Sequence, residues 1–245
     1  MSIFVSGSLC YDYIMDFPGK FEGHIIKDKI HELSVSFNID QLEKNLGGTA
    51  GNIAHNLKLI KNEPIILAPL GYDGKEYIEK LQNKNISTEQ IPVLEDKITS
   101  SAHITTDKKD NQITAFHNGA LSEANRLSIK NLNYQKLDYA ILSPFDPQAT
   151  VKFATECKEI DLNFNFDPGQ QVTSFSKIQI KECIQQAHSV IGNDYEIQLI
   201  KEKSNLSESD ILNNVELLIE TKGPEGSVIK TEGDKIEIDA CHPDE

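Results

Sequence analysis

Basic residues are scarce in this sequence, which has 24 Lys and Arg against 38 Asp and Glu and a formal net charge of −14. A protein of that charge is repelled by nucleic-acid phosphates and by anionic lipids. The sequence also lacks an apolar run long enough to span a membrane, and it does not begin with a signal-peptide pattern. We therefore expect a cytoplasmic protein that binds neither nucleic acid nor membranes.

Cysteine is also sparse, and no two cysteines form a C-x-x-C pair; the four are Cys10, Cys157, Cys183 and Cys241. This spacing excludes a zinc knuckle and a redox dithiol, so we expect reduced thiols. The histidines include no H-x-x-x-H pair, and no transition-metal site is predicted. No G-x-G-x-x-G follows the first apolar segment, and no Lys-Ser or Lys-Thr follows Gly51, so the dinucleotide-binding fingerprint and the P-loop are both missing.

Short apolar segments rich in Val, Ile and Phe alternate with helical stretches along the chain. This alternation predicts an α/β fold with a mainly parallel sheet covered by helices. The predicted strands are residues 3–6, 65–67, 139–143, 163–167, 189–192, 217–221, 227–230 and 236–238. The predicted helices are residues 75–83, 147–159, 177–187 and 195–203, and Ser207 with Asp210 caps one more.

Two segments, 11–38 and 98–117, interrupt this alternation with strand-like patterns and no helix, most clearly at residues 29–37. They predict a small β-sheet lid over the carboxyl ends of the core strands, where open α/β sheets bind ligands. The predicted division assigns residues 1–10, 39–97 and 118–245 to the α/β core and residues 11–38 and 98–117 to the lid. Exposed lid strands often pair with a second subunit, which suggests a homodimer through the lid.

The sharpest local motif is Gly47-Gly48, which opens a helical pattern. An apolar stripe predicts the face that packs on the sheet, and it consists of Ala50, Ile53, Ala54, Leu57 and Ile60. Unpaired N–H groups at a helix start, approached through glycines, suit hydroxyl or phosphate oxygens. The Asn52 amide lies off the stripe, and it donates and accepts at once, as a vicinal diol requires. A glycine pair that only permits tight packing is the alternative.

A second polar motif, Gly7-Ser8, ends the first predicted strand and is followed by Asp12. A carboxylate accepts two hydroxyl protons in the way a sugar diol offers them. An Asp after a strand is also a common turn residue or cap, so Asp12 has a structural alternative.

The order of motifs along the whole chain resembles the PfkB (ribokinase-like) carbohydrate kinase family, and its adenosine-kinase-like bacterial branch in particular. The motifs are Gly7-Ser8 with Asp12, FPGKF at 17–21, LSVSF at 33–37, Gly47-Gly48 with Asn52, FHNGALSEA at 116–124, DPGQQ at 167–171, Asn193-Asp194-Tyr195-Glu196 and TKGPEG at 221–226. The resemblance implies a Rossmann-type three-layer sandwich with a small β-sheet lid. It also implies an ATP-dependent kinase that phosphorylates the 5′-hydroxyl of a nucleoside, with adenosine as first candidate, or the primary hydroxyl of a sugar.

The resemblance also assigns roles residue by residue. At the substrate end, Asp12 and Asn52 would hold the ribose hydroxyls, Gly47 and Gly48 would form the sugar floor, Ser8 and Ser36 would line the pocket, and Phe116 would stack on the base. At the nucleotide end, Asn193 and Glu196 would place phosphate and Mg, with Glu196 acting on the metal indirectly, and Thr221 and Gly223 would lie along ATP. A structural alternative for Phe116 is an ordinary aromatic of the lid core.

The sequence departs from the family pattern at two places. Residues 101–104 offer only His103 as a second ring for the base. The family's Gly-Ala-Gly-Asp loop, which carries the catalytic base, is not found up to Glu245, so we expect a C-terminally incomplete chain whose base would lie beyond that residue. Loss of a general base costs about 10²–10⁴ in rate, which puts the activity of these 245 residues in doubt. The alternative is a catalytically dead protein that binds a nucleoside or sugar.

Overall fold

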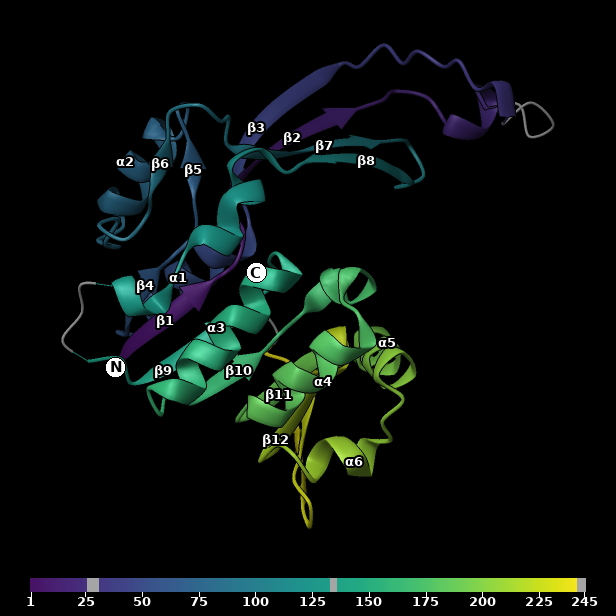
Figure 1. The fold of residues 1–245 in the computed structure, drawn as a ribbon. Coiled ribbons are helices and arrows are strands. Elements are labelled where there is room, and N and C mark those ends of the chain that lie inside the picture. Colours follow the sequence, from purple (N-terminus) through teal and green to yellow (C-terminus); the bar gives the residue numbers. More distant parts are fainter. Residues whose placement is uncertain (26–30, 133–135, 242–245) are drawn as a thin grey trace.

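The computed structural model describes residues 1–25, 31–132 and 136–241. An eight-stranded sheet in the order β14-β13-β12-β11-β10-β9-β1-β4 forms its centre (Figure 1). Its strands are β1 Ser2–Ser6, β4 Glu63–Ile66, β9 Tyr139–Leu142, β10 Phe164–Phe166, β11 Ser189–Asn193, β12 Leu217–Thr221, β13 Ser227–Lys230 and β14 Lys235–Ile238. Pairing is parallel from β4 to β12 and antiparallel from β12 to β14. The predicted α/β class is confirmed.

Four of the six α-helices among the described residues begin at a residue whose side chain caps them. The six are α1 Thr49–Leu59, α2 Lys75–Asn83, α3 Pro147–Glu159, α4 Lys177–Gln186, α5 Asp194–Ser204 and α6 Glu208–Leu212. Ser207 and Asp210 form the predicted capping box of α6, and Ser176 with Gln179 forms another at α4. Such reciprocal side-chain bonds satisfy N–H groups that a helix start otherwise leaves unpaired. Among the described residues, no helix is long and apolar enough to cross a membrane.

Helices pack on both faces of the sheet. The Phe4 ring lies 5.6 Å from the ring of Phe153 in α3, so Phe4 faces α3. Because strand side chains alternate, Ile3 and Val5 face the opposite side, where α1 contacts β1 and β4. The predicted stripe on α1 is buried at Ala50, Ala54 and Leu57. The prediction is wrong for Ile60, which caps the end of the helix and is 69% exposed.

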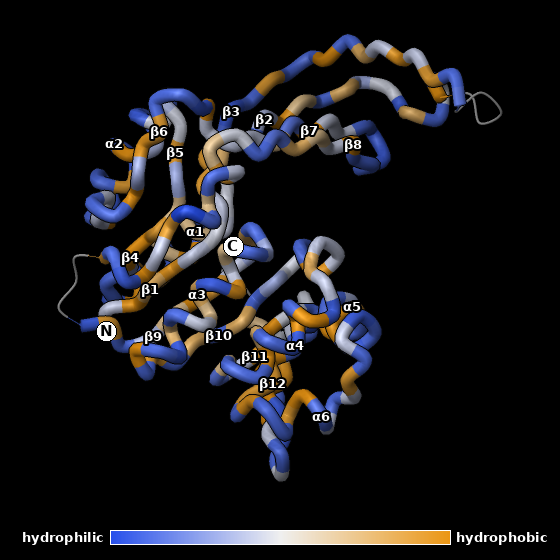
Figure 2. Tube along the Cα trace, in the orientation of Figure 1, coloured by the Kyte–Doolittle hydropathy of each residue, from blue (hydrophilic) through white to orange (hydrophobic). Residues whose placement is uncertain are grey.

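Four isoleucines lie in one row across the strands β11 to β14. The strand register pairs Ile191 with Ile219, Ile219 with Ile229, and Ile229 with Ile236. Their neighbours Val190, Leu218 and Val228 are buried, whereas the first three isoleucines are half-buried and Ile236 is 58% exposed. Figure 2 shows hydrophobic residues concentrated along the core strands, while the lid strands are mixed along their length.

A second sheet, the lid, projects from the core in the order β3-β2-β7-β8 (Figure 1). Its strands are β2 Cys10–Asp16, β3 Gln41–Gly47, β7 Ser100–Thr106 and β8 Gln112–His117. A two-stranded parallel sheet, β5 Leu70–Gly71 with β6 Val93–Leu94, lies beside α2. The lid predicted from the sequence is therefore present, with different strands at one edge.

The strand predicted at residues 29–37 is wrong within its described part. Residues 33–39 have no regular structure, and the strand that pairs with β2 is β3, which the sequence division placed in the core. Residues 29–30 lie outside the described residues. The apolar alternation has another cause, because Phe37 packs on Phe17 and Phe21, with ring centroids 4.8 and 5.0 Å apart. β3 itself is an exposed, largely polar edge strand, which gives a weak hydrophobic pattern.

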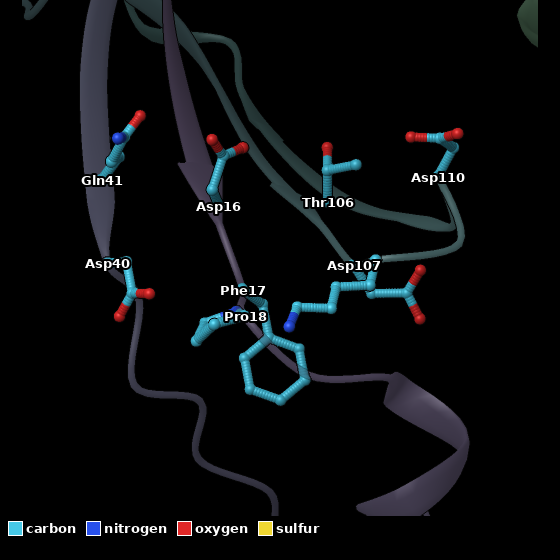
Figure 3. Close-up of a pocket in the computed structure, with 9 residues that line it drawn as sticks. Asp16, Phe17, Pro18, Asp40, Gln41, Thr106, Asp107 and Asp110 are labelled. Carbon is cyan, nitrogen blue, oxygen red and sulfur yellow. The ribbon is translucent and has the colours of Figure 1, made fainter.

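The outer end of the lid holds a shallow pocket of about 340 Å³ beside this aromatic cluster (Figure 3). Asp16, Asp40, Asp107 and Asp110 line it. Burial raises the pKa of Asp107, but hydrogen bonds from the N–H groups of Phe21, Lys109 and Asn111 outweigh it and lower that pKa to about 2. This carboxylate therefore ties the strand ends together and is not available to a ligand.

Candidate functional site

The carboxyl ends of five parallel strands meet at one edge of the core sheet, where open α/β sheets bind ligands. The residues at or just beyond these ends are Ser8, Ser143, Asp167, Asn193 and Thr221. Asn193 and Thr221 are direct neighbours in the register of β11 and β12. Since adjacent strands lie about 4.8 Å apart, the β1 and β11 ends are separated by about 14 Å along this edge. Both predicted ends of the site therefore share one edge.

The predicted Gly47-Gly48 turn carries the chain from the lid into α1, against the end of β1. Gly48 has a φ of 91°, and a Cβ there would lie 2.3 Å from the carbonyl oxygen of Ser8. The Ala50 N–H donates to that same carbonyl at 3.1 Å. The Ser8 hydroxyl accepts from the Thr49 N–H at 3.3 Å, and the Ser8 N–H donates to Thr49 Oγ1 at 3.3 Å. Only glycine permits this approach, so Gly48 has the tight-packing role that was the alternative interpretation of the glycine pair.

Gly47 brings the backbone equally close to Asp12. A Cβ on Gly47 would lie 2.1 Å from Asp12 Oδ2. The Tyr77 hydroxyl donates to the Gly47 carbonyl at 2.6 Å, which fixes the turn from the side of α2. Tyr77 was not predicted from the sequence, because a tyrosine within a helical pattern is normally a core residue. The carboxylate of Asp12 thus lies against bare backbone at the start of α1.

Asp12 belongs to a row of residues that crosses the lid sheet. In register, Asn45 pairs with Asp12, Asp12 with Ala102, and Ala102 with Phe116. Residues paired across a sheet point to the same face, so Asp12 and Phe116 share one face of the lid. The Cys10 thiol donates to Asp12 Oδ1 at 3.2 Å, and burial raises the pKa of this thiol, which keeps its proton in place.

Phe116 provides the aromatic surface on this face of the lid. It is 47% exposed, which does not fit the alternative of a lid-core aromatic. His103 is one residue out of phase with Ala102 and therefore faces the opposite side, where its ring stacks on Tyr13 with centroids 4.9 Å apart. Its Nε2 lies 3.2 Å from the Ser101 hydroxyl. His103 cannot form a second wall opposite Phe116 on the same face.

Asn52 lies at the glycine turn, whereas Ser36 lies away from it. Asn52 is exposed in the first turn of α1, and its N–H donates to the Gly48 carbonyl. Ser36 is exposed on the irregular segment before β3, farther out than Gln41, whereas Asp12 is opposite Asn45. The structure therefore gathers Ser8, Asp12, Gly47 and Asn52 around the turn, with Phe116 in the same row as Asp12, and it does not bring Ser36 to them.

At the other end of the edge, Asn193 and Glu196 form the capping box of α5. Asn193 Oδ1 accepts from the Glu196 N–H at 2.8 Å, and Glu196 Oε2 accepts from the Asn193 N–H at 2.9 Å. These bonds explain the Asn-x-x-Glu spacing structurally, and they leave the second carboxylate oxygen of Glu196 without a partner among the described residues. Thr221 ends the neighbouring strand, and Gly223 follows it with a φ of 56° and open space around its Cα.

Asp167 directly follows β10 and belongs to the same end of the site. Burial, together with the negative charge of Glu196, raises its pKa to about 6. The predicted site did not include Asp167, although a carboxylate right after a buried strand was a signal that could have identified it. Two carboxylates are therefore close enough to interact at the ends of β10 and β11, where an anion alone would be repelled and a cation favoured.

Known proteins share this sequence pattern and fold. The pattern that defines the pfkB family of carbohydrate kinases matches residues 6–245. A nucleoside kinase of Methanocaldococcus jannaschii is 34% identical over 213 residues, which are 86% of this chain and 69% of that protein. Another, from Methanothermobacter thermautotrophicus, is 26% identical over 240 residues, which are 96% of this chain and 73% of that protein.

Two solved structures agree closely in fold. The nucleoside kinase of Burkholderia thailandensis in complex with inosine matches with a TM-score of 0.85 and 33% identity, over 97% of this chain and 75% of that one. The M. jannaschii nucleoside kinase matches with a TM-score of 0.86 and 30% identity, over 97% of this chain and 76% of that one. The fold is thus the ribokinase-like α/β fold of a phosphotransferase. The chain belongs to the pfkB family of carbohydrate kinases, as its motifs predicted.

Asp167 makes the stability of the protein depend on pH in an unusual direction. Its pKa is raised from 3.8 to about 6 on folding, so its ionisation opposes the folded state increasingly from pH 3.8 to pH 6 and fully above pH 6. One pKa unit corresponds to about 1.4 kcal/mol, and Asp167→Asn should therefore raise the free energy of unfolding at pH 7 by roughly 2–3 kcal/mol. Urea unfolding should show this gain shrinking between pH 6 and pH 3.8. A gain that persists unchanged at acidic pH would contradict the assignment.

Proposed function

We propose that this chain is an ATP-dependent nucleoside kinase that phosphorylates the 5′-hydroxyl of its substrate, with adenosine as first candidate. Other nucleosides, or a sugar with a primary hydroxyl, are the next candidates. The observation that carries the proposal is the row in which Asp12 and Phe116 share one face of the lid beside the start of α1. A carboxylate for a diol and an aromatic face for a base are what a nucleoside requires.

The ribose would bind at the glycine turn. Asp12 offers a carboxylate, one oxygen of which already accepts from Cys10, and Asn52 offers an exposed amide. Two strand spacings separate the backbones of Asp12 and Phe116, about 10 Å, which lets one molecule contact both side chains. The two B. thailandensis kinase structures, in complex with inosine and with ADP-inosine, support a nucleoside and a nucleotide as the two ligands of this fold.

Magnesium would bind at the nucleotide end, beside ATP. Mg²⁺ prefers oxygen ligands and is usually held by one or two carboxylates together with waters and phosphates. Asp167 would provide such a carboxylate, the free oxygen of Glu196 would act on the metal indirectly, and Thr221 and Gly223 lie beside them along the sheet edge. When bound, the cation would neutralise charge on the transferred phosphate. The chain's own residues would hold the nucleotide in line with the sugar hydroxyl.

The substrate assignment is tested by Asp12→Asn, which keeps the shape of the side chain and removes its charge. Hydrogen bonds to a charged group contribute about 1.5–3 kcal/mol, so we expect adenosine and inosine to bind about 10- to 100-fold more weakly in calorimetry. Asp16→Asn is the matched control, because Asp16 lies on the same strand and face but at the outer end of the lid. Wild-type protein that binds no nucleoside would overturn the proposal.

Release of ADP in the presence of nucleoside and Mg-ATP distinguishes the kinase from its alternative. Transfer at an enzymatic rate supports the kinase. Nucleoside binding without transfer would favour a nucleoside-binding protein that does not catalyse phosphorylation.

Glu196→Gln separates the structural role of this residue from its proposed role toward magnesium. Glutamine at this position still closes a capping box, as Gln179 does in α4 with a bond of 2.8 Å from the Ser176 N–H. The protein should therefore stay folded, and its unfolding free energy at pH 7 should not fall, because the variant also removes the charge that helps to raise the pKa of Asp167. Loss of an indirect metal partner costs about 10- to 100-fold in metal affinity, and Mg²⁺-dependent ADP binding should weaken accordingly. Gln179→Glu is the control, and equal effects of both variants would contradict the metal role.

We also propose that two copies of the chain associate through the lid. On the face opposite Asp12, Leu42, Met15, Thr105 and Ile113 form one row, in which Leu42 is 61% and Ile113 is 45% exposed. Sedimentation velocity at tens of micromolar should show a dimer that Leu42→Lys dissociates, because a buried charge is costly. Ile178→Lys, on an exposed face of α4, should leave it intact. A monomeric wild-type protein would contradict the proposal.

A further inference from the structure

We propose that Asn118 recognises the six-membered-ring edge of a purine base, so that the site accepts 6-amino and 6-oxo purine nucleosides alike. This inference rests on the proposed nucleoside-binding function and extends it from the ribose to the base. It starts from a cavity of about 510 Å³ at the end of β8, which Phe116, Asn118 and Ser122 help to line. Phe116 thus belongs both to the row that contains Asp12 and to this cavity.

The backbone around Asn118 is held firmly. The following residue, Gly119, has a φ of 49°, and a Cβ there would lie 2.3 Å from the carbonyl of Ile98. The Ala120 N–H donates to that carbonyl at 2.8 Å, and the Leu121 N–H donates to the Asn118 carbonyl at 2.9 Å. A side chain at this position is therefore presented to the cavity from a fixed loop, as a recognition residue must be.

The amide of Asn118 has no structural task among the described residues. Asn118 occupies the capping position of η3, Gly119–Arg126, where asparagine normally accepts a bond from the helix start. Its backbone has helical angles, φ −65° and ψ −35°, and the side chain makes no cap bond. The exposed amide therefore keeps both its donor and its acceptor capacity for a ligand.

Two other polar groups of the cavity are already engaged. The Ser122 hydroxyl donates its proton to the Gly119 carbonyl at 2.7 Å. The Lys97 ammonium lies 3.1 Å from a carboxylate oxygen of Glu123. Asp96 also lines the cavity, but a carboxylate only accepts. Among the residues that line this cavity, the side chains of His117 and Asn118 can each donate and accept, and Asn118 is the one that does so through an amide.

The chemistry of the amide determines which bases it fits. The purine edge of adenosine presents an amino donor beside a ring-nitrogen acceptor, and that of inosine presents a ring N–H donor beside a carbonyl acceptor. An asparagine amide matches either pair, because rotation by half a turn exchanges its oxygen and nitrogen. The same side chain therefore binds both bases, and it binds a purine without a 6-substituent through one contact fewer.

The test compares Kd values of adenosine, inosine and purine riboside, which has no 6-substituent, by calorimetry on wild type and Asn118→Ala. One net hydrogen bond is worth about 0.5–1.5 kcal/mol, so wild type should prefer both 6-substituted nucleosides over purine riboside by about 3- to 10-fold. In Asn118→Ala the ratio between the Kd of purine riboside and that of either 6-substituted nucleoside should fall to about 1. A general loss of fold or of pocket shape would weaken all three ligands equally and leave the preference intact.

Asn213→Ala is the matched control, since Asn213 is an exposed asparagine at the end of α6. An unchanged preference in Asn118→Ala, or a wild-type preference for one of adenosine and inosine greater than about 10-fold, would overturn the role of Asn118. The proposed function would survive that result, because the wild-type protein would still bind nucleosides. Absence of all nucleoside binding by the wild-type protein would overturn both.

Discussion

The candidate site depends on one close contact between backbones, that of Gly48 with the carbonyl of Ser8. The contact joins the end of β1, the last residues of β3 and the first turn of α1, three segments that belong to two different sheets and a helix. A side chain of any other residue would push α1 away from β1. Because of this contact, the first turn of α1 and a carboxylate from the lid lie beside each other.

The lid sheet extends this arrangement through its register. Pairing across three strands sets Asp12, Ala102 and Phe116 on one face, and a shift of one residue in β8 would turn Phe116 to the other side. A small, buried residue, Ala102, stands between the other two. The charged end of the site follows a different principle, because the burial of Asp167, together with the negative charge of Glu196, costs stability that a cation would restore.

The sequence was most informative where local chemistry decides the structure. The helices at 75–83 and 147–159 and the strands at 217–221 and 227–230 have the predicted bounds, because apolar periods mark them and Asp146 caps the second helix. The lid was harder. Its strand β3 is exposed and polar, and its apolar alternation at 33–37 instead serves a cluster of aromatic rings.

Contacts between distant segments could not be predicted in the same way. The sequence indicated Asp12 and Gly47 separately, but their contact arises from strand pairing, and the bond from Tyr77 to Gly47 arises from the packing of α2. His103 illustrates the same limit, because only the register shows that its ring faces away from Phe116. The site residues therefore follow from motifs, whereas their grouping follows from topology.

The isoleucine row of β11 to β14 has a consequence for how the molecules behave toward one another in solution. Ile191, Ile219, Ile229 and Ile236 form a continuous apolar strip that is only partly covered. At a net charge of −14, long-range repulsion keeps such strips apart in dilute buffer. Added salt shortens the range of that repulsion to a few ångströms, and sulfate also strengthens apolar association, so any association through this strip would depend on the choice of salt.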